Sequence, residues 1–87
     1  MKDIEIRLLT EKDPIPFELL YLADPSIEAV RDYLKRGKCY IAVLREKVIG
    51  ECVLLPTRPF TVELVNLAVD EQYQGRGVAK QLIAYII

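Results

Sequence analysis

Hydrophobic and polar residues alternate at the start of the chain. Ile4, Ile6 and Leu8 are separated by charged residues, and a period of two is typical of a strand with one buried face. We therefore predict a first strand over residues 4–9.

Two helical segments follow this strand. Leucine and aromatic side chains recur at helical spacing from Phe17, which predicts a short helix that ends at about Ala23. Asp24 is predicted to cap a second helix, with Pro25 in its first position. A basic last turn followed by Gly37 predicts where that helix ends.

The middle of the chain contains two apolar runs joined by a polar turn. Residues 39–44 and 48–55 have the composition of strands, and residues 45–47 are charged, so we predict a β-hairpin. Prolines at both ends of residues 56–59 predict a break in the second strand, because proline cannot donate a backbone hydrogen bond.

A further strand is predicted over residues 60–69. Its second half is apolar on both faces of the pleat apart from Asn66, which is typical of an interior strand, often paired in parallel. A final helix is predicted to start near Arg76 or Gly77. Its apolar face consists of Val78, Leu82, Ile83 and Ile86.

The predicted order β-α-α-β-β-β-α indicates one domain over residues 1–87 in the α/β class, with a mixed sheet. A buried strand followed by a crossover helix is expected to have a parallel neighbour after that helix, and no residues remain to form it. We therefore expect a truncated domain, or one completed by another chain in a homodimer or strand-swapped oligomer.

Composition narrows the classes of partner. Twelve basic and thirteen acidic residues give a net charge of −1, so the basic surface typical of a nucleic-acid-binding protein is missing. No apolar run approaches the length of a membrane span or a signal peptide. We expect a cytoplasmic protein with neither nucleic acid nor membrane as a partner.

Cysteine and histidine usage excludes several kinds of site. Cys39 and Cys52 are expected to lie diagonally on paired strands, which favours buried free thiols over a disulfide. The chain has no histidine, so histidine-based triads and the usual zinc sites are excluded. No metal is expected.

The turn between the last strand and the last helix has the composition of an anion site. Gly75 and Gly77 let the backbone approach a ligand closely, and the free N–H groups of a helix N-terminus attract phosphate. A Walker loop would need Gly-Lys-Ser or Gly-Lys-Thr here, and the chain has Gly77-Val78-Ala79. A dinucleotide fingerprint would need a small residue where Lys80 stands.

The pattern Gln72-x-x-Gly75-x-Gly77, with an apolar strand before it and a helix after it, closely resembles the acetyl-CoA motif of the GNAT family of N-acetyltransferases. The resemblance covers the whole chain, but only the first half to two-thirds of a complete family domain. It implies the GNAT acyltransferase fold without its C-terminal strands and helix, and acetyl-CoA as cosubstrate. It also implies transfer of an acetyl group to a primary amine of a small molecule or peptide by direct attack on the thioester.

The resemblance also implies roles for particular residues. Backbone groups of residues 67–69 would hold the pantetheine arm, Gln72 would shape the turn, and backbone N–H groups of residues 74–79 would cradle the pyrophosphate. The implied cofactor-binding set is Leu67, Ala68, Val69, Gln72, Gln74, Gly75, Arg76, Gly77, Val78 and Ala79. Arg76 would add positive charge, whereas Lys80 fits a solvated helix face equally well.

Glu63 is the candidate general base, as a glutamate on this strand is in relatives that use one. Its apolar neighbours predict burial, which would raise its pKa toward a useful range. A structural carboxylate at the end of a strand is the alternative, and Asn66 is expected to be a satisfied buried amide. A second class of function stays open: a non-catalytic CoA-binding or structural fragment or subunit that needs a further chain or segment.

Overall fold

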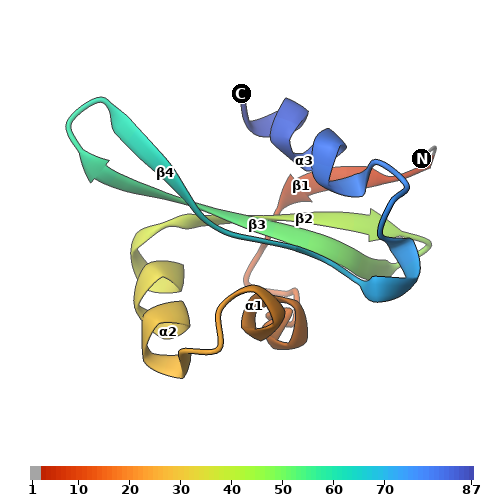
Figure 1. Ribbon diagram of the computed structural model, residues 1–87, viewed down its shortest axis with the longest axis horizontal. Coiled ribbons are helices and arrows are strands. Elements are labelled where there is room, and N and C mark those ends of the chain that lie inside the picture. Colours follow the sequence, from red (N-terminus) through yellow and green to blue (C-terminus); the bar gives the residue numbers. More distant parts are fainter. Residues whose placement is uncertain (1–2) are drawn as a thin grey trace.

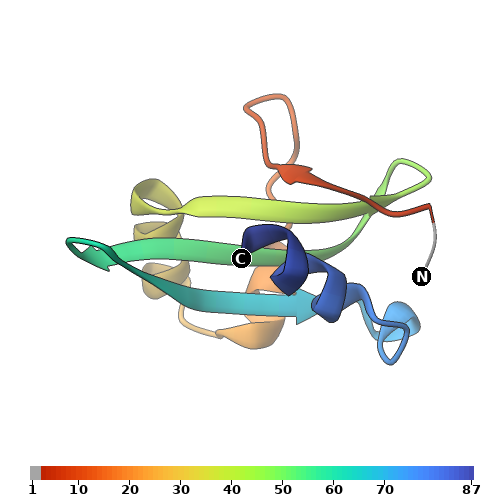
Figure 2. The same cartoon turned by 90° about the horizontal axis from the view of Figure 1, so that it is seen from above.

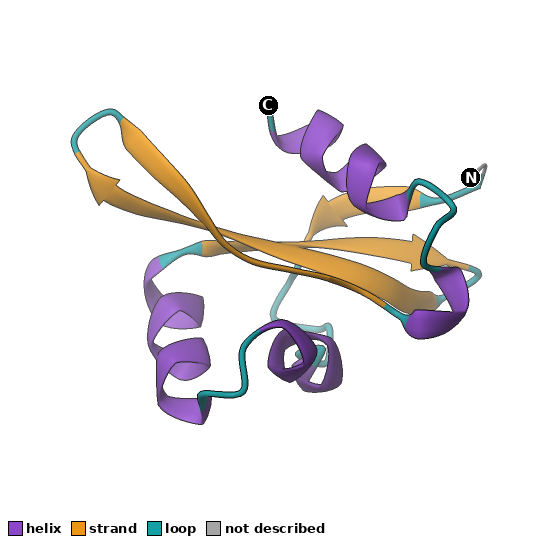
Figure 3. Cartoon of the chain, viewed as in Figure 1, coloured by secondary structure: helices purple, strands orange, loops and turns teal. Residues whose placement is uncertain are grey.

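The computed structural model describes residues 3–87, and its elements follow the predicted order (Figure 3). The elements are β1 (Glu5–Leu8), α1 (Phe17–Ala23), α2 (Ile27–Arg36), β2 (Lys38–Leu44), β3 (Lys47–Arg58), β4 (Thr61–Val69), the 3-10 turn η1 (Glu71–Tyr73) and α3 (Val78–Ile86).

The four strands form one sheet in the order β1-β2-β3-β4, and each described pair is antiparallel (Figure 2). Helices α1 and α2 cover one face and α3 covers the other (Figure 1). The predicted parallel neighbour of β4 does not occur within residues 3–87, where β4 forms an edge of the sheet.

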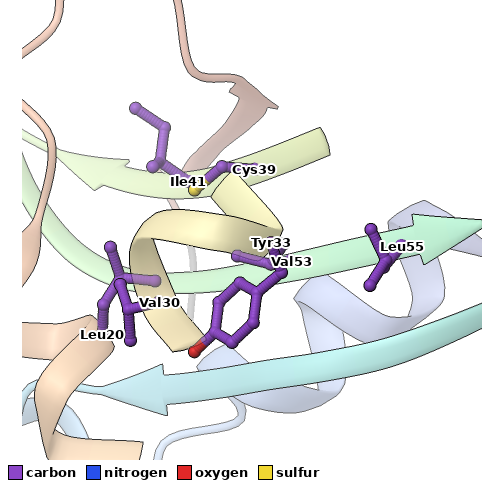
Figure 4. Packing of buried hydrophobic residues seen from close by; sticks show 7 residues of the cluster. All are labelled: Leu20, Val30, Tyr33, Cys39, Ile41, Val53 and Leu55. Carbon is purple, nitrogen blue, oxygen red and sulfur yellow. The ribbon is translucent and has the colours of Figure 1, made fainter. Parts of the chain in front are cut away.

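Each face of the sheet has its own hydrophobic core. On the α1/α2 face, the core contains Leu20, Val30, Tyr33, Cys39, Ile41, Val53 and Leu55 (Figure 4). On the α3 face, it contains Ala42, Ile49, Cys52, Val69, Val78 and Leu82. Both cysteines are buried and free, as predicted, and they lie on opposite faces of the sheet.

Helix α2 begins later than predicted. Its N-cap is Ser26, whose hydroxyl accepts a hydrogen bond from the Ala29 N–H at 3.2 Å. Asp24 instead accepts the N–H of Ser26 at 3.0 Å, so its carboxylate shapes the turn before the helix. The helix ends at Gly37 as predicted, where a Cβ would collide with the carbonyl oxygen of Leu54.

Strand β3 continues through the predicted break at Pro56. Pro56 is in register with Val62, and a register shift separates it from Arg58. Strand β2 pairs with β3 only as far as Leu54, which lies opposite Lys38. The last residues of β3 therefore have β4 as their single strand neighbour. Proline is tolerated there because one side of the strand needs no hydrogen-bond donor.

Strand β4 is less buried than its apolar composition predicted. Asn66, Ala68 and Val69 are buried, but Leu64 is 43% exposed. The strand begins at Thr61, because Phe60 occupies the hairpin turn with a positive φ of 65°. The expected covering on both faces is therefore confined to the end of β4 nearest the glycine turn.

Helix α3 begins at Val78, close to the predicted start, with Gly77 as its N-cap. Val78 and Leu82 are buried as expected, whereas Ile83 is 36% exposed. Within residues 3–87, no helix has the length and apolar character needed to cross a membrane.

Candidate active site

The turn between β4 and α3 has the conformation expected of its two glycines. Gly75 has a φ of 76° and Gly77 a φ of 85°, values in the left-handed region that glycine adopts without steric cost. Asp70 starts the turn, since its carboxylate accepts the Gln72 N–H at 3.0 Å. The side-chain amide of Gln74 donates to the Val69 carbonyl at 3.0 Å.

This conformation leaves the N-terminus of α3 open. Gly77 has no side chain to cap the helix, and the first backbone N–H groups of an α-helix have no acceptor within the helix. A helix N-terminus of this kind can bind an anion, because its N–H groups and the positive end of the helix dipole attract negative charge.

Positive charge also gathers beside this turn. The Lys47 ammonium lies 5.6 Å and the Arg76 guanidinium 5.8 Å from the centre of the Tyr73 ring. Lys47 also pairs with Asp70 at 3.7 Å, which links the β2–β3 turn to the glycine turn. Both cations therefore lie next to the glycine turn, although neither lines the pocket over it.

Two adjoining pockets form a groove from the glycine turn along β4. They share Val69, Gln74 and Ala79. The pocket over the turn is completed by Tyr73, Gly75, Gly77, Val78 and Lys80. The pocket further along β4 is completed by Leu22, Ala23, Leu67 and Ala68.

The groove brings together most of the residues singled out from the sequence. Gln72 and Arg76 do not line it, and Gln72 enters the turn through its backbone N–H. Leu22 and Ala23, at the end of α1, were missed because nothing in their local sequence indicates which strand the helix will pack against.

Asn66 connects β4 to α1, the helix that forms one wall of the groove. Its side-chain amide donates to the Leu20 carbonyl at 3.0 Å and to the Tyr33 hydroxyl at 2.6 Å. The Tyr33 hydroxyl in turn donates to Asp24 at 3.4 Å. The donor half of Asn66 is satisfied as expected, but its buried Oδ1 has no partner within residues 3–87.

Glu63 lies further along β4, near the hairpin tip. A register shift at Val65 places Glu63 opposite Leu55 and Asn66 opposite Val53, so both side chains belong to the α1/α2 face. The predicted burial is wrong: Glu63 is exposed and accepts a hydrogen bond from the Thr57 hydroxyl at 3.2 Å. The last part of β3, which continues past Pro56, supplies this contact without covering the carboxylate.

A second glutamate is the buried one. Glu51, in the middle of β3, is 0% exposed, and burial raises its pKa to about 8. The sequence carried a signal for it, because a charged residue inside the apolar run 48–55 either forms a local break or becomes a buried polar group.

Comparisons with a family model and with a curated protein both point to acetyltransferases. The model of the acetyltransferase (GNAT) family matches residues 5–87. A protein of Bacillus subtilis (strain 168), described as the uncharacterized N-acetyltransferase YvbK, is 47% identical over 83 residues, which are 95% of this chain and 54% of that protein.

Two solved structures share the fold. A GNAT family acetyltransferase from Elizabethkingia anophelis with acetyl-CoA bound is 40% identical with a TM-score of 0.94, over 99% of this chain and 56% of that one. A Bacillus subtilis acetyltransferase in complex with CoA is 48% identical with a TM-score of 0.84, over 92% and 53%. The chain thus spans about half the length of these relatives.

Proposed function

Because the chain belongs to the GNAT family of acetyltransferases, we propose that it binds acetyl-CoA in the groove along β4 and donates the acetyl group to a primary amine. The observation that carries this proposal is the open N-terminus of α3, with two left-handed glycines, at one end of that groove. The two structures described above, of chains at least 40% identical, hold acetyl-CoA or CoA.

The proposed binding mode uses backbone groups at both ends of the groove. The pyrophosphate accepts hydrogen bonds from the N–H groups of residues 74–79. The pantetheine amides pair with the outer edge of β4 at residues 67–69, where no described strand competes for the backbone groups. Leu22 and Ala23 form the opposite wall and exclude water from the arm.

In the proposed reaction, the amine nitrogen attacks the thioester carbon, a C–N bond forms, and the C–S bond breaks as CoA leaves with a proton. Much of the rate enhancement comes from holding the amine beside the thioester. Glu63 is proposed to accept the proton of the amine, directly or through water, because the bulge at Val65 places it on the α1/α2 face.

This proposal is tested by calorimetry with acetyl-CoA and by measuring free-thiol release with a panel of primary amines. Binding together with amine-dependent thiol release is expected. Binding without transfer would favour the alternative function, a non-catalytic CoA-binding fragment or subunit. Two observations also support that alternative: the apolar side chains of Val62 and Leu64 are exposed, and the chain matches only about half the length of its relative. Absence of acetyl-CoA binding would contradict the proposed function.

Replacing the candidate base should separate chemistry from binding. Glu63→Gln is expected to lower the turnover number about 100-fold or more. Its affinity for acetyl-CoA should stay nearly unchanged, because Glu63 lies outside the groove. Steady-state kinetics of the wild type and the variant, together with calorimetry, provide the measurement.

The matched control is Glu28→Gln, which removes one exposed carboxylate from the first turn of α2. It should leave turnover intact. Normal turnover in Glu63→Gln would remove this residue from the mechanism.

A further inference from the structure

Two buried polar groups on the α1/α2 face lack partners. Neither carboxylate oxygen of Glu51 makes a hydrogen bond of adequate geometry within residues 3–87, and the same holds for Oδ1 of Asn66. Both side chains are almost fully buried, at 0% and 4% exposure. A buried acceptor without a donor costs free energy, so each of these groups needs an explanation.

The strand register makes the two side chains neighbours. Glu51 lies opposite Ala68, and Asn66 lies opposite Val53. Glu51 and Asn66 are therefore diagonal neighbours on the same face of the β3–β4 pair. Side chains in this relation are close enough for long residues to meet.

The orientation of the Asn66 amide is fixed by its other contacts. Its Nδ2 faces the Leu20 carbonyl, which can only accept, and the Tyr33 hydroxyl, which donates to Asp24. A flipped amide would place two acceptor oxygens against each other. Oδ1 is thus the group that requires a donor.

We propose that Glu51 is a neutral carboxylic acid that donates its O–H to Oδ1 of Asn66, and that this proton completes a buried clasp between β3, β4 and α1. One proton gives a donor to Asn66 and removes the charge from Glu51. A protonated carboxyl group is the form of glutamate that can donate a hydrogen bond.

The surroundings of Glu51 favour the neutral form. The titratable groups around it are the Tyr33 hydroxyl from α2, with Asp24 behind it, and the Cys39 thiol on the same face of the sheet, whereas the Cys52 thiol lies on the α3 face. Burial raises the pKa of Cys39 to about 12 and that of Cys52 to about 11, so both thiols are neutral at pH 7. Among residues 3–87, no cation is found to shift the pKa of Glu51, although the Ala68 N–H partly offsets the effect of burial.

The clasp acts on the groove. Asn66 holds the carbonyl of Leu20, and the next turn of α1 carries Leu22 and Ala23, which face residues 67–69 across the groove. Glu51 and Asn66 are therefore positioning residues that set the width of the groove. Their link to acetyl-CoA rests on the proposed function, whereas the clasp itself is a property of the free protein.

Substitution of Glu51 by glutamine and by methionine tests the proposal on the whole chain. Glu51→Gln keeps an N–H donor of similar shape, and Glu51→Met keeps the volume without a donor. Infrared spectroscopy should show the carbonyl band of a protonated carboxylic acid at pH 7 in the wild type, and both variants should lose it.

Thermal melts provide the second measurement. The pKa of Glu51 rises from 4.5 to about 8 on folding. Between these two pH values, the folded state therefore keeps a proton that the unfolded state has lost. The melting temperature of the wild type should therefore fall relative to Glu51→Gln between about pH 4.5 and 8, and level off above pH 8. At pH 7, Glu51→Met should melt about 5–10 °C below Glu51→Gln, because Oδ1 of Asn66 stays buried without a donor.

Three results would overturn the clasp. The first is the absence of a protonated-acid band at pH 7, and the second is an equal melting temperature for the glutamine and methionine variants. The third is a melting temperature that depends on pH in Glu51→Gln just as it does in the wild type. Loss of transfer in Glu51→Gln with normal acetyl-CoA affinity would also overturn it, since Glu51 would then act on the reacting atoms. Failure of the wild type to bind acetyl-CoA would count against the proposed function alone, because the spectra and melts need no ligand.

Discussion

Gly75→Asp and Gly77→Asp are each expected to abolish acetyl-CoA binding. Both glycines have left-handed φ values, and a Cβ at Gly75 would meet nothing within 4 Å, so a new side chain there projects into the space proposed for the pyrophosphate. An aspartate beside a bound phosphate places like charges together, which costs several kcal/mol. Calorimetry should show a loss in affinity of about 100-fold or more.

Two controls separate charge from conformation. Gly75→Asn has similar volume and tolerates the left-handed region about as well as aspartate, so it should lose clearly less affinity than Gly75→Asp. Ala84→Asp adds the same charge to an exposed position later in α3 and should bind acetyl-CoA almost normally. Unchanged affinity in both glycine-to-aspartate variants would contradict the proposed phosphate cradle.

The sequence predicted those parts of the fold that depend on local pattern. The strand at Glu5–Leu8, the helix that ends at Gly37 and the strand-turn-helix around Gly75 all follow from periodicity or from glycine conformation. The family pattern at Gln72–Gly77 added the fold that these elements form. Each of these signals lies within about ten residues of the chain, where propensity and spacing are informative.

The features that the sequence did not predict depend on neighbours distant along the chain. Pro56 stays in β3 because β2 begins at Lys38, opposite Leu54, which leaves one side of β3 free beyond Leu54. Glu63 is exposed because the hairpin β3–β4 extends beyond the helices at that end (Figure 1). Burial of Glu51 requires β2, β4 and the helices together, and no local pattern specifies all of these contacts.

Leu82→Ala is expected to cause the largest loss of stability on the α3 face. Leu82 is 0% exposed and belongs to the core that joins α3 to the sheet. Truncation removes its apolar burial and leaves a cavity, which together cost about 2–5 kcal/mol. A domain with a free energy of unfolding of about 5–15 kcal/mol should show a large shift of its urea midpoint.

The same substitution should also weaken the proposed acetyl-CoA site, because Leu82 holds the helix whose N-terminus is proposed to bind the phosphate. Gly50 allows α3 to lie close to the sheet, since a Cβ there would come within 3.0 Å of Val78 and 3.3 Å of Leu82. Leu82→Met conserves volume and should cost less than about 1.5 kcal/mol, with near-normal affinity. If Leu82→Ala lowers the free energy of unfolding by less than about 1 kcal/mol, other contacts must hold α3 to the sheet. The position of the N–H groups at the start of α3 would then depend on the glycine turn rather than on the core beneath the helix.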